Sequence, residues 1–332
     1  MHAPGHRYPQ RYVRYGALAR DTDSITADSC PEKGSRSLVR IDLHTHSNRS
    51  DGTDPVDVLI AHAKRDGLDV IALTDHDTAD GWGEGRRAAE DLGIGFVPGI
   101  EISCKLNGIS VHLLGYLLDP SYQPLAAELA TVRDGRTDRI PSIVARLNSM
   151  GVVLTVDEVL AQATGTPSVG RPHVADALVA NGTVVNRSEA FDRFLADGRP
   201  GHVSHYAIEP GRAIDLVREA GGVPVIAHPW GRSSYKVMNA ERIAQLVTEH
   251  GLAGIEVDHQ DHSPESRTAL RAIAQDLGII YTGSSDHHGV GKIDHDLGVN
   301  TTEPEQFQRL LDVAKSNAAA ASDATVPEAY LP

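Results

Sequence analysis

Residues 38–46 read LVRIDLHTH and residues 68–77 read LDVIALTDHD, with the stretch DPVDVLIAHAKRDG (54–67) between them. The two short runs are rich in Val, Ile and Leu, as strands buried on both faces are. The middle stretch carries apolar residues at helical spacing and ends in glycine. A strand, a helix and a second strand in this order predict parallel strands joined by a right-handed crossover, and therefore an α/β fold.

The same alternation continues along the chain. Five further runs have the character of strands: GIGFVPGIEIS (93–103), ISVHLLGYLL (109–118), GVPVIAHP (222–229), LAGIEVDHQ (252–260) and GIIYTGSSDHH (278–288). Helical patterns lie between most of them, at 85–93, 211–222, 239–251 and 264–278. We therefore expect seven strands in a parallel α/β architecture.

One long stretch departs from this alternation. Residues 121–208 hold helical patterns but no clear strand, and they predict an inserted, mostly helical subdomain. Its helices are expected near 122–150, 155–163, 172–181 and 187–197. The main domain then consists of residues 38–120 and 209–316. Residues 1–37 and 317–332 lack sustained periodicity and are interpreted as a flexible extension and a flexible tail.

Composition excludes several classes of protein. The 332 residues include 31 Lys and Arg against 45 Asp and Glu, and the net charge of −14 argues against binding duplex nucleic acid. No apolar run approaches the roughly 20 residues of a membrane helix, and the first residues lack the apolar stretch of a signal peptide. Two cysteines cannot form a disulfide framework. We expect a cytoplasmic protein without a membrane partner.

Metal-binding residue types gather where the apolar runs end. His44 and His46 are separated by one residue, so in an extended chain both imidazoles point to one face, where one ion could take both. Asp286 and His288 repeat this spacing. The candidates at or near strand ends are His44, His46, Asp51, His76, Glu101, His112, His228, Asp258, His259, Asp286 and His288. The carboxyl ends of parallel strands are where α/β folds place their sites.

These candidates outnumber the four to six ligands of one ion, so we expect two or three divalent ions. Glu101 is the preferred bridge between ions, because an unpaired carboxylate in an apolar strand would be costly to bury. Imidazole together with carboxylate suits Mn, Zn or Fe, and the choice among them stays open. Paired ions make hydroxide from water and hold both oxygens of a displacement at phosphorus. The pattern therefore predicts hydrolysis of a phosphate ester by a metal-bound hydroxide.

Six motifs carry a family resemblance: DLHTHSNRSDGT (42–53), LTDHDT (73–78), PGIEIS (98–103), VHLLGY (111–116), AHP (227–229) and SSDHH (284–288). In this order, over residues 42 to 298, they resemble the PHP (polymerase and histidinol phosphatase) family of metal-dependent phosphoesterases. The resemblance implies a distorted (β/α)7 TIM-like barrel with a trinuclear metal site. The ligands that it implies are His44, His46, Asp51, His76, Glu101, His112, His228, Asp286 and His288.

The length and the insertion resemble the branch of this family that acts on 3′,5′-nucleotide bisphosphates and on 5′-phosphorylated RNA. The expected substrate is thus a small phosphorylated molecule, a nucleotide or a short single-stranded oligonucleotide. Arg171 and His173 match an Arg-x-His of that branch, and Arg171 is expected to grip a substrate phosphate during catalysis. The other expected substrate-binding residues are His202, Trp230 and Arg232. His205, or less favourably His202, is expected to act as the general acid.

Three alternatives remain open. The first is a phosphatase similar to histidinol phosphatase, or a proofreading nuclease module of a polymerase. The second is an amidohydrolase that cleaves C–N bonds, a class that also begins with two histidines at this spacing. Such enzymes often bridge their ions with a lysine at a strand end, and no lysine is expected at a strand end in this sequence. The third is a metal-dependent binding module without catalysis.

Overall fold

The structure is a computed structural model that describes residues 39–321 and 324–332. The flexible extension expected at residues 1–37 lies outside the described residues. In the part that is described, we find no helix with both the length and the apolar character needed to cross a membrane.

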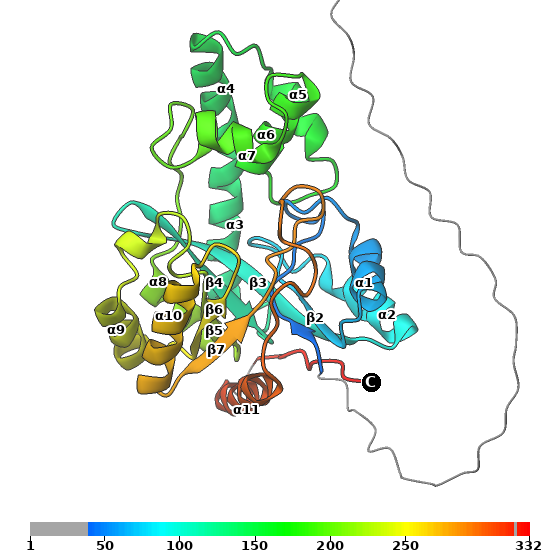
Figure 1. Ribbon diagram of the computed structural model, residues 1–332, viewed down its shortest axis with the longest axis vertical. Helices are drawn as coiled ribbons and strands as arrows, with labels where there is room; N and C mark the ends of the chain where they lie inside the picture. The colour runs from blue at the N-terminus through cyan, green and yellow to red at the C-terminus, as the bar shows by residue number, and fades with distance from the viewer. Residues whose placement is uncertain (1–38, 322–323) are drawn as a thin grey trace, which may run out of the picture. The chain divides into compact units, whose positions relative to one another are not determined.

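Seven strands form one sheet in chain order: β1 (Ile41–Asp42), β2 (Val70–Leu73), β3 (Gly95–Leu106), β4 (Ile109–Tyr116), β5 (Val223–Ala227), β6 (Gly254–Asp258) and β7 (Ile280–Gly283). Parallel pairing joins β1 to β2 and β2 to β3, and also β5 to β6 and β6 to β7. A bridge between Thr45 and His287 brings the ends of β1 and β7 together. The sheet is thus a nearly closed barrel, which confirms the predicted fold class (Figure 1).

The expectation of a fully parallel sheet is wrong at β4, which runs antiparallel to both β3 and β5. Asn107 and Gly108 connect β3 to β4, and their φ angles are +50° and +80°. Positive φ at both central residues is the geometry of the two-residue hairpin turn that Asn-Gly favours. This dipeptide is therefore the sequence signal that distinguishes a hairpin from a crossover.

Helices cover the outside of the barrel (Figure 1). They are α1 (Val56–Arg65), α2 (Trp82–Leu92), α8 (Pro210–Glu219), α9 (Ala240–His250) and α10 (Pro264–Asp276), with a short 3-10 helix at Ser234–Lys236. Each of the five α-helices overlaps a stretch predicted to be helical. Their apolar faces join the outer faces of the strands in one cluster, to which Leu59, Ile214 and Leu270 contribute fully buried side chains.

A second apolar cluster fills the inside of the barrel at the amino ends of its strands. Strand residues such as Ile41 and Val225 meet Phe307 and Leu310 of α11 (Pro304–Ala320) there. Figure 1 shows α11 below the sheet. Because this end is filled by apolar side chains, the polar groups of the strands gather at the opposite, carboxyl end.

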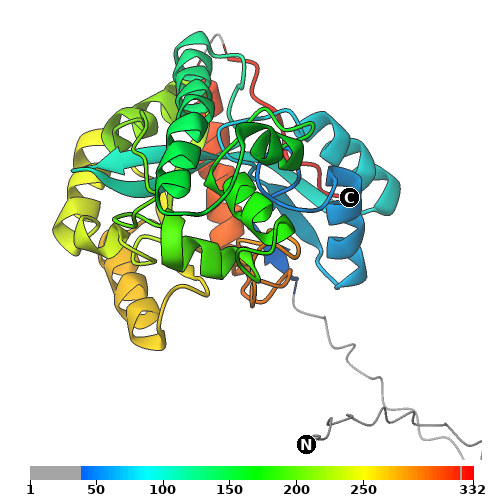
Figure 2. The ribbon, with the colours of Figure 1, turned by 90° about the horizontal axis from the view of Figure 1, so that it is seen from above.

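Between β4 and β5 the chain forms α3 (Gln123–Asp138), α4 (Ile140–Ser149), α5 (Val156–Gln162), α6 (Arg171–Ala180), α7 (Arg187–Ala190) and a π-helix at Phe191–Leu195. They surround an apolar cluster of their own, which includes Ile143, Leu147 and Leu178. The single helix expected at 122–150 is two helices, because Pro141 near the start of α4 lacks the N–H that a continuous helix needs. Figure 2 shows this helical segment lying across the barrel when seen from above.

The end of the chain packs on the barrel, which differs from the flexible tail expected at 317–332. α11 continues to Ala320. Tyr330 then pairs antiparallel with Phe96 through N–H···O bonds of 2.8 and 2.9 Å, and Arg86 lies 5.3 Å from the centre of the Tyr330 ring. These partners lie more than 200 positions earlier in the chain. Local composition cannot reveal contacts of this range.

Candidate metal centre

Two motifs with the same spacing face each other where the barrel closes. His44 and His46 follow β1, both fully buried, with their Nε2 atoms 3.0 Å apart. Asp286 and His288 follow β7, and Asp286 Oδ1 lies 3.5 Å from His44 Nε2 and 3.4 Å from His46 Nε2. The bridge between the middle residues, Thr45 and His287, aligns the two motifs. The side chains flanking the bridge therefore meet on one face.

Glu101 lies at the centre of the arrangement. It occupies the middle of β3 rather than its end, and it is 1% exposed. Imidazole nitrogens surround its carboxylate: His44 at 3.3 Å, His46 at 3.1 Å, His76 at 3.2 Å, His112 at 2.7 Å and His228 at 3.2 Å. Glu101 thus contacts imidazoles that come from β1, β2, β4 and β5 or from the residues just after them.

Asp51 reaches the same place from the loop after β1. Its Oδ1 lies 3.3 Å from His288 Nε2 and 3.7 Å from His46 Nδ1, and its Oδ2 lies 3.6 Å from His76 Nε2. The loop is tight at Gly52, where a Cβ would lie 2.3 Å from the carbonyl oxygen of His46. Only glycine allows this close approach of two backbone segments.

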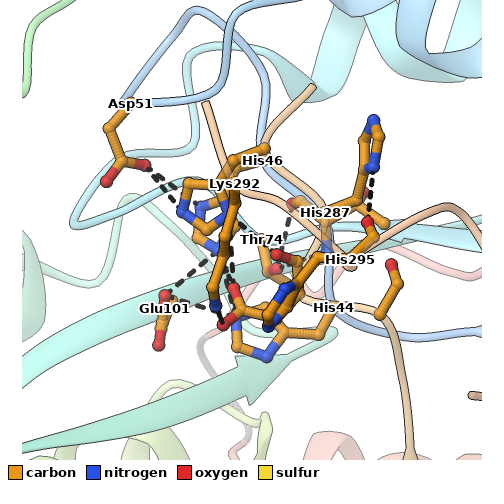
Figure 3. A network of polar contacts seen from close by, with 12 residues as sticks. His44, His46, Asp51, Thr74, Glu101, His287, Lys292 and His295 are labelled. Carbon is orange, nitrogen blue, oxygen red and sulfur yellow. Dashed lines mark hydrogen bonds and ion pairs between the residues drawn. The ribbon is translucent and has the colours of Figure 1, made fainter. Parts of the chain in front are cut away.

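The structure therefore brings together all nine residues that were expected to be ligands. Three overlapping groups have ligand atoms within 4.8 Å of one another: His46, Asp51, His76 and His288; His44, His46, Glu101 and Asp286; and His76, Glu101 and His112. His228 joins them through its contact with Glu101. We call these nine side chains the imidazole-carboxylate cluster. Figure 3 shows Asp51 and Glu101 on one side of His46 and His44, with dashed contacts to the imidazoles.

The carboxylates of this cluster and some of its imidazoles have the protonation states that metal binding requires. Burial raises the pKa of Glu101, but nearby imidazoles lower it more, so it falls well below its usual range, and the pKa of Asp51 behaves in the same way. Burial also raises the pKa of Asp286, but Lys292 and then His44 and His288 lower it well below its usual range. Burial lowers the pKa of His228 and His288 to about 4. Ionised carboxylates and neutral imidazoles are the states that bind metal. These buried oxygen and nitrogen donors fit a multinuclear centre of divalent ions.

His46 differs from these two imidazoles. Burial lowers its pKa, but Asp286 and Glu101 raise it more, to about 9. A cation that binds His46 therefore displaces a proton.

Glu256 is a site residue that the sequence analysis missed. This fully buried residue of β6 places Oε1 3.2 Å from His44 Nδ1, and its Oε2 accepts the backbone N–H of His228 at 2.9 Å. A carboxylate behind a ligand-type imidazole fixes the orientation of the ring. The available signal was an acid within the apolar run GIEVD, which is the argument that singled out Glu101.

Further polar residues surround Asp286. His259 Nε2 lies 3.2 Å from Asp286 Oδ2, and Lys292 Nζ contacts the same oxygen. No role was assigned to His262 and His295 from the sequence. Both are buried beside the site, where His262 accepts the Trp230 N–H at 3.2 Å and His295 Nε2 lies 3.8 Å from the Asp261 carboxylate.

Positive charge gathers next to the imidazole-carboxylate cluster. We call Lys105, Arg136, Arg139, Arg171 and His205 the basic cluster. The two clusters meet at β3, where Arg136 donates to Ser103 Oγ at 2.6 Å and Ser103 pairs with His112 of β4. Lys105, next to the last residue of β3, donates to the His205 carbonyl oxygen at 2.7 Å. A lysine thus does lie near a strand end, against expectation, but it is bonded outside the imidazole-carboxylate cluster.

Arg139 and His205 form the core of the basic cluster. Arg139 Nη1 donates to His205 Nδ1 at 2.9 Å, so the neutral ring carries its proton on Nε2. Burial, and then the neighbouring Arg139, Arg136 and Lys105, lower the pKa of His205 to about 2. Burial, with Arg171 and Arg136, lowers that of Arg139 to about 8. Within the described residues, the buried His205 Nε2 has no hydrogen-bond partner.

The other expected substrate-binding residues of the helical segment have protein partners. Arg171 pairs with Asp197 at 2.8 Å, and His202 Nε2 lies 3.3 Å from the same carboxylate. His173 is buried, and its Nδ1 accepts the N–H of Gly170 at the start of α6. These contacts place Arg171 and His202 at the margin of the basic cluster, while His173 supports the helix start.

Trp230 and Arg232 lie beyond β5. The Trp230 indole N–H donates to the Met238 carbonyl at 2.7 Å, and the ring packs against the outer apolar cluster. The Arg232 side chain is 57% exposed, with its Nε 3.5 Å from Asp261 Oδ2. Arg232 is therefore accessible to solvent, while the indole is held in place by the protein.

Known proteins share both the sequence and the fold of this chain. Residues 42–148 match the family model of the PHP domain. The chain is 34% identical over 262 residues to a 3′,5′-nucleoside bisphosphate phosphatase of Chromobacterium violaceum, covering 79% of this chain and 91% of that protein. It is 31% identical over 252 residues to a 5′-3′ exoribonuclease of Haemophilus influenzae, covering 75% and 90%. A solved structure of a candidate metal-dependent phosphoesterase from Bifidobacterium adolescentis has a TM-score of 0.78 at 35% identity, covering 82% and 96%.

Proposed function

Because this chain belongs to the PHP domain family of metal-dependent phosphoesterases and is a hydrolase of phosphoric ester bonds, we propose that its substrates are phosphorylated nucleotides. The substrates are 3′,5′-nucleotide bisphosphates or short 5′-phosphorylated RNA, in which a second phosphate accompanies the scissile ester. One observation carries this proposal: the imidazole-carboxylate cluster adjoins the basic cluster at Ser103, and two arginines of the basic cluster, Arg136 and Arg139, are buried.

The nine residues of the imidazole-carboxylate cluster would hold two or three divalent ions of Mn, Zn or Fe, with Glu101 as the carboxylate shared between them. Such ions, when bound, lower the pKa of water and stabilise charge on phosphoryl oxygens. The chain's own contribution is to fix the ligands. Glu256 orients His44 and His228, and Asp75 holds the loop of Asp51 by accepting the Ser47 N–H at 2.8 Å.

The basic cluster binds the second phosphate. Its arginines and Lys105 supply four cations, and the ion pairs of Arg136 with Asp77 and of Arg171 with Asp197 offset two of them. Arg139 is 6% exposed and makes no ion pair with a carboxylate in the described part of the chain. A phosphate would supply the missing negative charge and accept two parallel N–H bonds from a guanidinium. Nucleotides with a second phosphate fit this need better than histidinol phosphate does.

His205 is proposed to bind this phosphate through Nε2–H rather than to act as the general acid. Its pKa of about 2 leaves the ring neutral at neutral pH, so it has no surplus proton for a leaving oxygen. Its unpartnered Nε2 is instead available to donate a hydrogen bond. This proposal replaces the role expected from the sequence.

A substrate series with one variant tests the proposed function. The Mn-loaded protein is assayed on adenosine 3′,5′-bisphosphate, adenosine 3′-monophosphate, a short 5′-phosphorylated RNA and histidinol phosphate. Arg139→Met is expected to lower kcat/KM for the bisphosphate about 10- to 100-fold, the equivalent of one charge-assisted hydrogen bond, and to leave the monophosphate little changed.

Arg193→Met is the matched control, because Arg193 pairs with Glu189 on the surface of the same helical segment. It is expected to behave as the unaltered protein on every substrate. Equal turnover of histidinol phosphate and the bisphosphate, or equal losses on mono- and bisphosphate in Arg139→Met, would contradict the proposal.

A further inference from the structure

We propose that Arg187, in the helical segment between β4 and β5, is a positioning residue for Asp51 and so belongs to the support of the metal centre. The inference rests on the proposed function, in which Asp51 is a ligand. It makes the helical segment a structural part of that centre as well as the source of the basic cluster.

Arg187 joins the helical segment to the ligand loop through one guanidinium. Its Nε and Nη2 donate to the two carboxylate oxygens of Asp176 on α6, each at 2.6 Å. Its Nη1 donates to the backbone carbonyl of Asp51, also at 2.6 Å. The side chain is 11% exposed. Burial lowers the pKa of Arg187, but Asp176 raises it more, so the group stays charged.

These bonds leave Arg187 unsuited to hold substrate. The Asp176 carboxylate neutralises its charge, and three of its five N–H groups already have acceptors. Arg139, by contrast, makes no ion pair with a carboxylate in the described chain. The pairing with Asp176 instead fixes the direction of Nη1, as a bidentate contact does.

The Asp51 loop needs such support from outside the barrel. On the inner side, Asp75 accepts hydrogen bonds from Ser47 and Ser50. On the outer side, the contacts come from the helical segment: Arg187 binds the Asp51 carbonyl, and Thr166 Oγ1 donates to the carbonyl of Arg49 at 2.7 Å. The direction of the Asp51 carboxylate therefore depends on both sides.

Arg187 also contacts the loop after β7. A Cβ on Gly291 would lie 2.3 Å from Arg187 Nη1, so the guanidinium packs closely against this loop. This loop follows His288, which lies 3.3 Å from Asp51. Arg187 thus bonds to the loop that carries Asp51 and packs against the loop that follows His288.

Calorimetric titration of the chelator-treated full chain with Mn²⁺ tests the inference. Arg187→Met keeps much of the side-chain length and removes every bond described above. We expect it to weaken the binding of at least one ion about 10- to 100-fold, as loss of a residue that orients a ligand does. Arg193→Met, the control in the same segment, is expected to titrate as the unaltered chain.

A double-mutant cycle separates positioning from general damage to the helical segment. If Arg187 acts through Asp51, then Arg187→Met adds no further loss of Mn²⁺ affinity in an Asp51→Ala background. Additive losses would show that Arg187 acts elsewhere and would overturn the inference. Arg187→Lys, which keeps the charge but not the fork, is expected to recover part of the affinity.

The outcomes also separate the inference from the proposed function. Unchanged Mn²⁺ binding in Arg187→Met, beside normal binding by the unaltered chain, overturns the inference alone. Failure of the unaltered chain to bind Mn²⁺ overturns both.

Discussion

Glu101 and Glu256 show how a single residue reveals a site. Each is a carboxylate within an apolar strand, and each is less than 2% exposed. Burying an ionised carboxylate is costly unless it is paired and hydrogen-bonded. Contacts with imidazoles offset that cost for both residues. Glu101 contacts five imidazoles, and Glu256 contacts His44. An acid in the middle of a buried strand therefore indicates a candidate site residue.

Glu256→Gln removes the charge behind His44 while keeping the shape of the side chain. We expect metal affinity to fall about 10- to 100-fold, because the His44 ring loses the carboxylate that fixes its orientation toward the metal. Calorimetric Mn²⁺ titration measures this. Glu303→Gln is the control, since Glu303 binds Tyr281 and Arg271 on the surface. Equal affinity in both variants would exclude Glu256 from the support of His44.

At this scale the sequence predicted the candidate ligands better than their supports. Regular spacing and strand ends identify His44, His46, Asp286 and His288. No sequence pattern identifies Lys292 and Arg187 as supports. Their partners, Asp286 and Asp51, lie in loops that come close to them only in the folded chain. His205 was expected to be the acid from its place in the sequence, which does not show the burial and the arginines that lower its pKa to about 2 in the folded chain.

The β3–β4 hairpin is the element that turns an α/β alternation into this barrel. It reverses one strand and pairs Ser103 with His112, which lies beside Glu101. The other strands, the outer helices and most helices of the inserted segment lie where periodicity predicted them. Strand direction was mistaken because apolar runs of this length look alike in parallel and antiparallel pairs, and only the turn residues differ.

One glycine substitution tests the hairpin, and a second, in α2, is its control. We expect the two to change the free energy of unfolding in opposite directions. Gly108→Ala is expected to lower the free energy of unfolding by about 1–2 kcal/mol, because its φ of +80° strains any side chain. Gly83→Ala in α2 is expected to raise it by about 0.5–1 kcal/mol, because a Cβ there meets nothing within 4 Å. Urea unfolding measures both. A Gly108→Ala variant as stable as Gly83→Ala would exclude the positive-φ turn.

Asp119 holds the last segment of the chain. Its carboxylate accepts a hydrogen bond from the Ser121 hydroxyl at 2.7 Å and N–H bonds from Ser121 and Thr325, each at 2.8 Å. Burial raises the pKa of Asp119, but these hydrogen bonds lower it by more, so the pKa in the folded chain lies below the ordinary 3.8. The carboxylate therefore contributes stability above about pH 3.8, and this contribution is lost as pH falls through the folded pKa.

Hydrogen exchange at the Thr325 amide tests this contact. Protection is expected to be high near neutral pH and to fall below about pH 3.8 before protection of the barrel strands falls. Asp119→Asn is expected to weaken that protection already at neutral pH. Protection unaltered by the substitution would show that other contacts hold the segment.

Across the whole molecule, the placement of charge explains how a chain of negative net charge could attract a negatively charged phosphate ester. The net charge is −14, which repels phosphates over most of the surface. Positive charge is concentrated where helices α3 and α6 approach β3, through Arg136, Arg139, Arg171 and Lys105. The barrel supplies ligand-type groups and the helical segment supplies cations. Under the proposed function, neither part contains the complete site.

The count of metal ions per chain tests the central claim most directly. The purified protein is loaded with Mn²⁺, freed of excess ions and analysed for metal, and its phosphoesterase activity is measured in parallel. We expect two or three ions per chain, with hydrolysis lost on chelation and restored by Mn²⁺. Less than one ion per chain in protein that still hydrolyses phosphate esters would contradict the account.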